Sequence, residues 1–196
     1  EICFPAAILQ PPFFNADADD AVNYGAIGVV ISHEMTHGFD DQGRLFDKDG
    51  NMNNWWTDED AAAFAAKTAV LVEQFNKVEI LPGLMANGAA TLGENIADHG
   101  GLRIAFTAME NSFGEEHPEP IDGFTAEQRF YIAYAGVWAQ NITDTEKQRR
   151  TLTDVHSLGE NRVNVSLRNL DTFFEAFGIK EGDRMWRPEN ERVTIW

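Results

Sequence analysis

The sequence predicts a mainly α-helical domain with a small β-hairpin and a short N-terminal strand. Apolar residues recur at three- and four-residue intervals in several segments, which is the spacing of a buried helix face. Helix-opening patterns precede two of these segments, and one of the two is rich in alanine, a strong helix former. No repeat, low-complexity tract or linker divides the chain, so residues 1–196 are expected to form a single domain.

The first part of the chain mixes extended and helical patterns. Residues 1–14 are apolar and contain three prolines, which predicts a short strand and then an extended segment, because the residue before proline avoids the helical region. Residues 24–40 carry apolar side chains at helical spacing and predict a buried helix. Residues 43–54 predict a small hairpin around a polar turn at residues 47–51.

Two longer helices are expected in the middle of the chain. Thr57 followed by three acidic residues is typical of a helix start, and the alanine-rich stretch after it predicts a helix to about residue 78. A further helix is expected over residues 91–111, although it contains three glycines. Each glycine lowers helix stability by up to about 1 kcal/mol, so close packing of another backbone is the expected compensation.

The C-terminal part predicts two more helices and one extended segment. Thr125 and Gln128 have the spacing of a capping box, which predicts a helix to about residue 141. Residues 163–167 are expected to be extended. Residues 171–177 predict a short helix that ends at a glycine.

The charge and cysteine content exclude several classes of function. The chain has 32 acidic and 15 basic residues and a formal net charge of −17, which excludes a nucleic-acid partner and adsorption on an anionic membrane. Cys3 is the single cysteine, so neither an internal disulfide nor a thiolate metal cluster is expected. No apolar run approaches the ~18 residues of a membrane span, so no membrane contact is expected from this segment.

The N-terminus is expected to lie inside a longer parent chain. The sequence opens in the middle of an apolar segment, without an initiator methionine or a cleavage site. The compartment of the parent, cytoplasmic or exported, is therefore left open.

The strongest chemical signal is the segment His33-Glu34-Met35-Thr36-His37. Residues four apart on a helix are separated by about 40° of rotation, so His33 and His37 project side by side and can both bind a tetrahedral Zn²⁺. Glu34 then lies near the metal without having to ligate it, where a carboxylate can accept a proton from a water on the metal. The competing interpretation is a helix whose histidines only satisfy core or surface hydrogen bonds.

A third ligand is expected from the segment Gly93–Asp98. Glu94 and Asp98 are also four apart, so they share one face of a helix that otherwise looks buried, where unpaired carboxylates are costly. Glu94 is therefore a candidate ligand, and Asp98 a candidate acceptor for the free ring N–H of a ligating histidine. The alternative is an exposed acidic edge. Asp40 is either a second such acceptor or only a polar residue near a helix end.

These motifs resemble those of a known enzyme family. The segments Val30–Asp40 and Gly93–Asp98 are similar to the paired zinc-binding motifs of the neprilysin family of zinc endopeptidases, peptidase family M13. The segments Phe4–Phe14 and Asp154–Ser157, together with the C-terminal Trp196, also match the family, so the resemblance covers essentially the whole chain. The chain has no cysteine near its C-terminus, and in this respect it resembles the bacterial branch of the family.

The resemblance implies a gluzincin-type helical catalytic domain that holds one Zn²⁺ and hydrolyses short peptides on the amino side of hydrophobic residues. It implies the following roles: His33, His37 and Glu94 as zinc ligands; Glu34 as catalytic base; His156 as the residue that stabilises the oxyanion; Arg162 as a contact to the substrate carbonyl; Asp40 and Asp98 as carboxylates that support the ligands and the catalytic centre; and Asp154 as the partner of His156. Asp154, two residues before His156, would favour a charged imidazolium.

The resemblance also implies partners outside this chain. In the family, an upstream strand binds the substrate backbone and a large helical domain encloses the chamber, so the expected partners are peptide substrates and the N-terminal portion of the parent enzyme. Three alternatives stay open: an aminopeptidase with the same zinc geometry, a metal-loaded binding module without hydrolytic activity, and a metal-free helical interaction domain. His99 is interpreted as a structural residue and His117 as an exposed loop residue.

Overall fold

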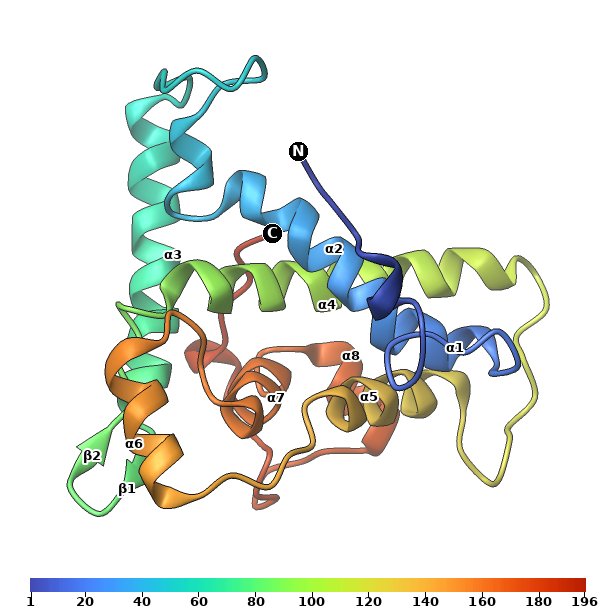
Figure 1. Ribbon diagram of the computed structural model, residues 1–196. Helices are drawn as coiled ribbons and strands as arrows, with labels where there is room; N and C mark the ends of the chain where they lie inside the picture. The colour runs from blue at the N-terminus through green and yellow to red at the C-terminus, as the bar shows by residue number, and fades with distance from the viewer.

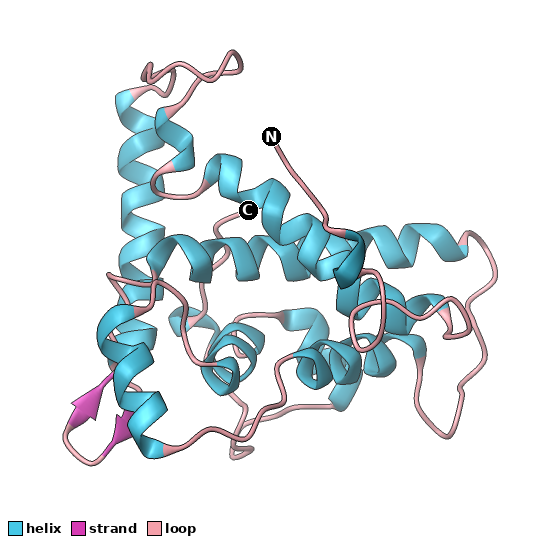
Figure 2. Ribbon diagram, viewed as in Figure 1, coloured by secondary structure: helices cyan, strands magenta, loops and turns pink.

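A computed structural model describes all residues from 1 to 196, and Figure 1 shows its arrangement. The helices are α1 (Asp20–Asn23), α2 (Val29–Thr36), α3 (Asp58–Asn76), α4 (Leu92–Phe113), α5 (Ala126–Val137), α6 (Asp144–Thr153), α7 (Gly159–Leu167) and α8 (Asp171–Phe177). The strands β1 (Glu79–Leu81) and β2 (Leu84–Met85) form one antiparallel pair, so the molecule is mainly helical, as expected (Figure 2). None of these helices combines the length and apolarity needed to cross a bilayer.

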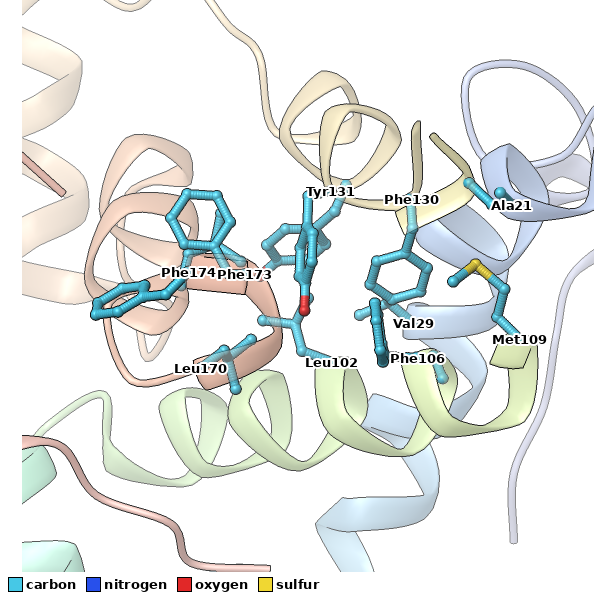
Figure 3. Packing of buried hydrophobic residues seen from close by; sticks show 14 residues of the cluster. Ala21, Val29, Leu102, Phe106, Met109, Phe130, Tyr131, Leu170, Phe173 and Phe174 are labelled. Carbon is cyan, nitrogen blue, oxygen red and sulfur yellow. The ribbon is translucent and has the colours of Figure 1, made fainter. Parts of the chain in front are cut away.

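Helix α4 is the central element of the fold. It contacts α2, α3 and α7, and Figure 1 shows α2 along one side of it and α5, α7 and α8 along the other. The larger hydrophobic cluster fills the space between α4, α5 and α8, where the aromatic rings of Phe106, Phe130, Tyr131 and Phe173 pack edge to face or stacked (Figure 3). This packing holds α4 rigidly, and α4 is one of the two helices that carry the candidate metal ligands.

The glycines of α4 allow α2 to approach very closely. A Cβ atom added at Gly101 would lie 2.8 Å from the backbone nitrogen of His33, and one at Gly100 would lie 2.6 Å from the side chain of Thr36. Real Cβ atoms essentially never come so close to other heavy atoms. The expectation that another backbone packs against the glycines is confirmed at Gly101, where that backbone belongs to the segment that contains His33. At Gly100 and Gly93 the nearest atoms belong instead to the side chains of Thr36 and of Asp40 and Asp41.

Several expected helices are confirmed, with small differences at their ends. Helices α3, α4, α5 and α8 correspond to the four helices expected after residue 56, and α8 ends at Gly178 in the left-handed conformation (φ 62°). The helix expected over residues 24–40 is divided into a π-helical turn at Tyr24–Gly28, α2, and a 3₁₀ turn at His37–Phe39.

The expected N-terminal strand is absent. Residues 1–14 contain only a 3₁₀ turn at Ala6–Ile8 and further turns, and no other segment pairs with them. The prolines lack the N–H groups that a strand would donate to a neighbour, and without such a neighbour the apolar pattern does not produce a strand.

The small hairpin lies elsewhere than predicted. Residues 43–54 form a 3₁₀ turn at Gly43–Leu45 and a single antiparallel bridge between Phe46 and Met52, not a pair of strands. The β1–β2 hairpin forms instead around Gly83, whose positive φ of 80° allows the tight turn.

Two further differences concern the C-terminal part. Residues 163–167 belong to helix α7 and are not extended. Their β-branched valines favour an extended chain locally, but the helix buries Val165 and Arg162 against the rest of the protein, and tertiary packing overrides the local preference. Helix α6 was not expected, although Thr143 caps it by accepting a hydrogen bond from the backbone N–H of Glu146.

Candidate metal centre and active site

Three side chains from two helices converge on one point. His33 and His37 project from α2 and the turn that follows it, and their Nε2 atoms lie 3.0 Å apart. Glu94, in the first turn of α4, places Oε2 3.2 Å from Nε2 of His33 and Oε1 3.6 Å from Nε2 of His37. The two imidazoles thus lie on one face, as their helical spacing predicted, and the fold brings to them a carboxylate that is 57 or more residues away in the sequence.

The opposite nitrogen of each histidine is held by a carboxylate. Nδ1 of His33 lies 2.9 Å from Oδ1 of Asp98, and Nδ1 of His37 lies 2.7 Å from Oδ2 of Asp40. Since a carboxylate only accepts, each Nδ1 donates its hydrogen, and in the neutral imidazoles both Nε2 lone pairs face Glu94. Two imidazole lone pairs and a carboxylate this close to one another repel unless a proton or a cation lies between them.

The donor set fits a tetrahedral zinc ion. Ligand atoms at about 2.0–2.1 Å from a tetrahedral metal are about 3.3 Å apart. Here the two imidazole nitrogens are 3.0 Å apart, and each lies 3.2 or 3.6 Å from one of the two carboxylate oxygens of Glu94. In addition, Oε2 of Glu94 is buried and has no hydrogen-bond partner, although a buried carboxylate oxygen normally has one. Two neutral imidazoles and one carboxylate are a donor set that Zn²⁺ prefers.

The surroundings of the two histidines favour their protonated forms. Burial lowers the pKa of His33, but its hydrogen bond to Asp98 and the nearby carboxylate of Glu94 outweigh burial and raise the pKa to about 9. The hydrogen bond to Asp40 raises the pKa of His37. Burial raises the pKa of Glu94, but the nearby rings of His33 and His156 lower it overall. The site is thus built to stabilise positive charge between the three side chains.

Asp98 is shared between His33 and Arg162. Arg162, on α7, donates from Nε to Oδ2 of Asp98 at 2.7 Å and from Nη2 to Oδ1 at 2.6 Å, and both side chains are almost fully buried. Burial raises the pKa of Asp98, but the Arg162 charge outweighs it and holds the pKa at about 2. The guanidinium also lies 3.8 Å from the ring of Trp138, which covers one side of it.

His156 approaches the ligand carboxylate from a third direction. It lies in the loop between α6 and α7, and its Nε2 is 3.4 Å from Oε1 of Glu94. Asp154 accepts hydrogen bonds from Nδ1 of His156 at 2.8 Å and from its backbone N–H at 3.0 Å. The structure therefore brings this histidine, which sequence spacing alone could not place, to the edge of the site.

A cavity of about 230 Å³ opens beside these groups. Its polar lining residues are His33, Glu34, Asp98, His156 and Arg162. The remainder is mostly apolar and is lined by Ile8, Phe13, Ala26, Val29, Val30, Tyr134, Val137 and Trp138. A larger cavity of about 710 Å³ lies between α5 and α7 and contains none of the candidate metal ligands.

Sequence reasoning missed several residues of the site. Tyr134 and Trp138 line the cavity, and their four-residue spacing on α5 is the only signal that could have paired them. Asn95 and Ser157 bridge α4 and the His156 loop by a hydrogen bond of 2.8 Å. No sequence pattern connects these two residues, because they are 62 positions apart in the chain.

The fold and the site define the class of protein. Two histidines four residues apart on a helix, a glutamate between them, and a third donor from a second helix are the arrangement of the gluzincin metallopeptidases. A sequence model of peptidase family M13 matches residues 1–193, and the chain belongs to this family.

The chain is similar to curated M13 proteins from animals and bacteria. It is 43% identical to endothelin-converting enzyme 1 of Homo sapiens over 199 residues, which is 100% of this chain and 26% of that protein. It is 40% identical to the neutral endopeptidase of Lactococcus lactis subsp. lactis (strain IL1403) over 195 residues, 100% of this chain and 29% of that protein. This chain thus spans about a quarter to a third of the length of these relatives.

Solved structures agree with the fold. The crystal structure of the Mycobacterium tuberculosis zinc metalloprotease Zmp1 in complex with an inhibitor superimposes with a TM-score of 0.95 at 46% sequence identity. The match covers 98% of this chain and 30% of that chain. The structure of PepO from Lactobacillus rhamnosis HN001 matches with a TM-score of 0.87 at 35% identity, over 98% of this chain and 29% of the other.

Proposed function

We propose that this chain is the metal-binding catalytic part of a zinc metalloendopeptidase that hydrolyses short peptides. The observation that carries the proposal is the convergence of His33, His37 and Glu94 at tetrahedral spacing beside a cavity that also contains Glu34. Membership in peptidase family M13 supports the same reaction class.

His33, His37 and Glu94 would hold one zinc ion per chain. When bound, the metal supplies Lewis acidity, which acidifies a water and polarises the carbonyl of the bond to be cleaved. The carboxylates of Asp98 and Asp40 fix the tautomers and orientations of the two imidazoles and increase their basicity.

Glu34 is the proposed general base. It follows His33 directly, is exposed to solvent and lines the cavity, so it can reach a water beside the ligand side chains. Its carboxylate would accept a proton from the attacking water and later donate it to the leaving amine. Because Glu34 does not bind the metal itself, it remains free to carry this proton in both directions.

His156 and Arg162 are proposed to bind the substrate carbonyl groups. Asp154 holds Nδ1 of His156, and Nε2 of the same ring lies 3.4 Å from Oε1 of Glu94, where a ring N–H can face the substrate carbonyl. A donor in this place stabilises the negative charge that develops on the carbonyl oxygen during attack. Arg162 lines the same cavity and is held by Asp98, so its remaining donors have a fixed direction.

The apolar cavity is the proposed basis of specificity. Its volume of about 230 Å³ and its aliphatic and aromatic lining suit one large hydrophobic side chain. Such a side chain on the carboxyl side of the cleaved bond would place that bond next to Glu34. This arrangement corresponds to cleavage on the amino side of hydrophobic residues.

The upstream part of the parent enzyme is proposed as the partner that completes the substrate site. This chain spans 26% of endothelin-converting enzyme 1 and 29% of the Lactococcus neutral endopeptidase. The exposed apolar residues Ile31, Met35 and Phe39, which recur every four positions along the metal-binding segment, would be covered by that part.

Metal content and cleavage together test the proposal. We expect about one zinc per chain in protein purified without chelator, and a loss of bound zinc in His33→Ala and Glu94→Ala. The native full-length protein is then assayed on a peptide with a free N-terminus and on its acetylated form. Equal cleavage of both supports an endopeptidase, whereas a requirement for the free N-terminus indicates an aminopeptidase. Tight zinc without cleavage would leave only a metal-loaded binding module.

A further inference from the structure

Two adjacent residues of α4 meet two adjacent residues of the His156 loop. Glu94 and Asn95 follow one another in the first turns of α4, and His156 and Ser157 follow one another between α6 and α7. Nε2 of His156 lies 3.4 Å from Oε1 of Glu94, and Oγ of Ser157 donates to Oδ1 of Asn95 at 2.8 Å. The loop is thus attached to the helix directly beside the contact between the histidine and the ligand carboxylate.

The orientation of the Asn95 amide is determined by its neighbours. The hydroxyl of Thr91 donates to the backbone carbonyl of Asn87 at 3.1 Å, so its oxygen can only accept from Asn95. Nδ2 of Asn95 donates to that oxygen at 2.9 Å, which turns the amide oxygen toward Ser157. Ser157 has a single hydroxyl hydrogen, and its 2.8 Å contact to Asn95 is shorter than its 3.2 Å contact to Thr91.

This hydrogen bond is well protected from water. Asn95 is only 1% exposed, and both ends of its amide are paired within the Thr91–Asn95–Ser157 cluster. A buried amide that is paired through both its nitrogen and its oxygen holds its partners in one geometry, since any movement would break one of these bonds.

The other contacts of His156 do not set its distance from Glu94. Asp154 holds the ring and the backbone of His156, but it belongs to the same loop and moves with it. The Arg162–Asp98 ion pair holds the start of α7, six residues after His156. Ser157 joins the loop to the start of α4 next to the histidine, by its short bond to Asn95 and by its longer contact to Thr91.

We infer that Asn95 is a positioning residue for His156 and acts through the Ser157 hydroxyl. This inference rests on the proposed function, in which His156 donates to the carbonyl oxygen of the substrate. The side chain of Asn95 bonds Thr91 and Ser157 and does not line the cavity beside the candidate ligands. Small displacements of a donor that acts in the transition state lower turnover much more than they change substrate binding.

The test is a double-mutant cycle in the native full-length protein, with Asn95→Ala, His156→Ala and their combination. We expect Asn95→Ala to lower kcat about tenfold and His156→Ala about a hundredfold, each with little change in KM or zinc content. If Asn95 acts through His156, the double variant is no slower than His156→Ala alone. Losses that multiply in the double variant would overturn the inference.

Further variants separate positioning from general damage to the fold. Ser157→Ala should reproduce the loss of Asn95→Ala, and Ser157→Thr, which keeps the hydroxyl donor, should restore most of the turnover. Asn169→Ala serves as the matched control, because Asn169 is equally buried but bonds Gln74 and Arg187 far from His156. It should lower thermal stability without any coupling to His156. Should His156→Ala leave turnover unchanged, the proposed role of His156 fails, and that outcome differs from a simple failure of coupling.

Discussion

Asp98 and Arg162 form a bidentate, buried ion pair directly behind the candidate metal ligand His33. The Asp98 carboxylate accepts hydrogen bonds from Arg162 at 2.6 and 2.7 Å and from Nδ1 of His33 at 2.9 Å. This side chain of α4 therefore connects α7 to the candidate ligand on α2. We therefore expect Asp98 to affect both metal binding and stability, and the two effects can be measured separately.

Asp98→Asn is expected to weaken zinc binding and to destabilise the metal-free protein. Loss of the carboxylate behind His33 should lower zinc affinity about 10- to 100-fold, measured by competition with a chromogenic chelator. The unpaired, buried Arg162 should cost about 3–5 kcal/mol in the free energy of unfolding, measured with urea. Combining Asp98→Asn with Arg162→Met should recover much of the stability but not the affinity. Full zinc affinity in Asp98→Asn would contradict the orienting role.

Glu34→Gln is expected to abolish turnover while zinc content stays the same. The amide keeps the shape of the side chain but cannot accept the proton, so kcat should fall by roughly 10²- to 10⁴-fold. Zinc is measured by elemental analysis and turnover with an internally quenched peptide. Glu175→Gln, an exposed change on α8, serves as the matched control and should alter neither quantity. Substantial turnover in Glu34→Gln would refute its assignment as the base.

Gly101→Ala is expected to destabilise the protein and to disturb the metal site together. The added Cβ would lie 2.8 Å from the backbone nitrogen of His33, and two backbones pressed apart cost about 1–3 kcal/mol. Gly136→Ala is the matched control, because this exposed glycine of α5 has no atom within 4 Å of an added Cβ. It should be neutral or stabilising by up to about 1 kcal/mol. Thermal melts and zinc titrations of the two variants measure the difference.

His99 is expected to make the stability of the protein sensitive to acid. Burial, together with the charges of Arg103 and Arg187, lowers the pKa of this fully buried histidine from 6.5 to about 3. Between pH 6.5 and pH 3 the unfolded chain therefore binds a proton that the folded chain does not. Stability falls as the pH falls through this range, by up to about 1.4 kcal/mol per pH unit from this group.

His99→Leu should remove that part of the pH dependence. Both ring nitrogens of His99 lack hydrogen-bond partners, so an apolar side chain of similar size loses no hydrogen bond within the protein. Urea unfolding at several pH values should give a shallower slope of stability against pH in the variant. Leu102→Val, an apolar core change, should lower stability without changing the slope. An unchanged slope in His99→Leu would show that His99 is already protonated in the fold.

Phe13→Ala is expected to change the preference for the side chain that enters the cavity. Phe13 lines the apolar part, so its truncation enlarges the space available to the substrate. The ratio of kcat/KM for tryptophan over leucine peptides should rise about tenfold, which is within the range of a single hydrophobic pocket contact. Leu152→Ala, an exposed change on α6, should leave the ratio unchanged. An unaltered ratio in Phe13→Ala would place the specificity pocket elsewhere.

Short sequence patterns correctly predicted helices whose starts depend on residues close together in the sequence. The capping residues Thr57 and Thr125 accept the expected hydrogen bonds at the starts of α3 and α5. The prediction of an extended segment at residues 163–167 was wrong, because local preference and tertiary packing disagree there. The valines favour an extended chain, but the segment is part of α7, which buries Arg162 beside Asp98. The apolar residues 1–14 failed as a strand because no neighbouring strand pairs with them.

The sequence alone determined which candidate metal-binding residues share a helix face. The positions of His33 and His37 on one helix face, and of Glu94 and Asp98 on another, follow from the 3.6-residue period, which needs no knowledge of the fold. Tertiary structure alone decided which faces meet. The glycines at 100 and 101 let α4 pack directly against α2, and long-range folding brings His156 within 3.4 Å of Glu94. Contacts between residues more than 50 positions apart depend on the packing of whole helices, and no local pattern encodes them.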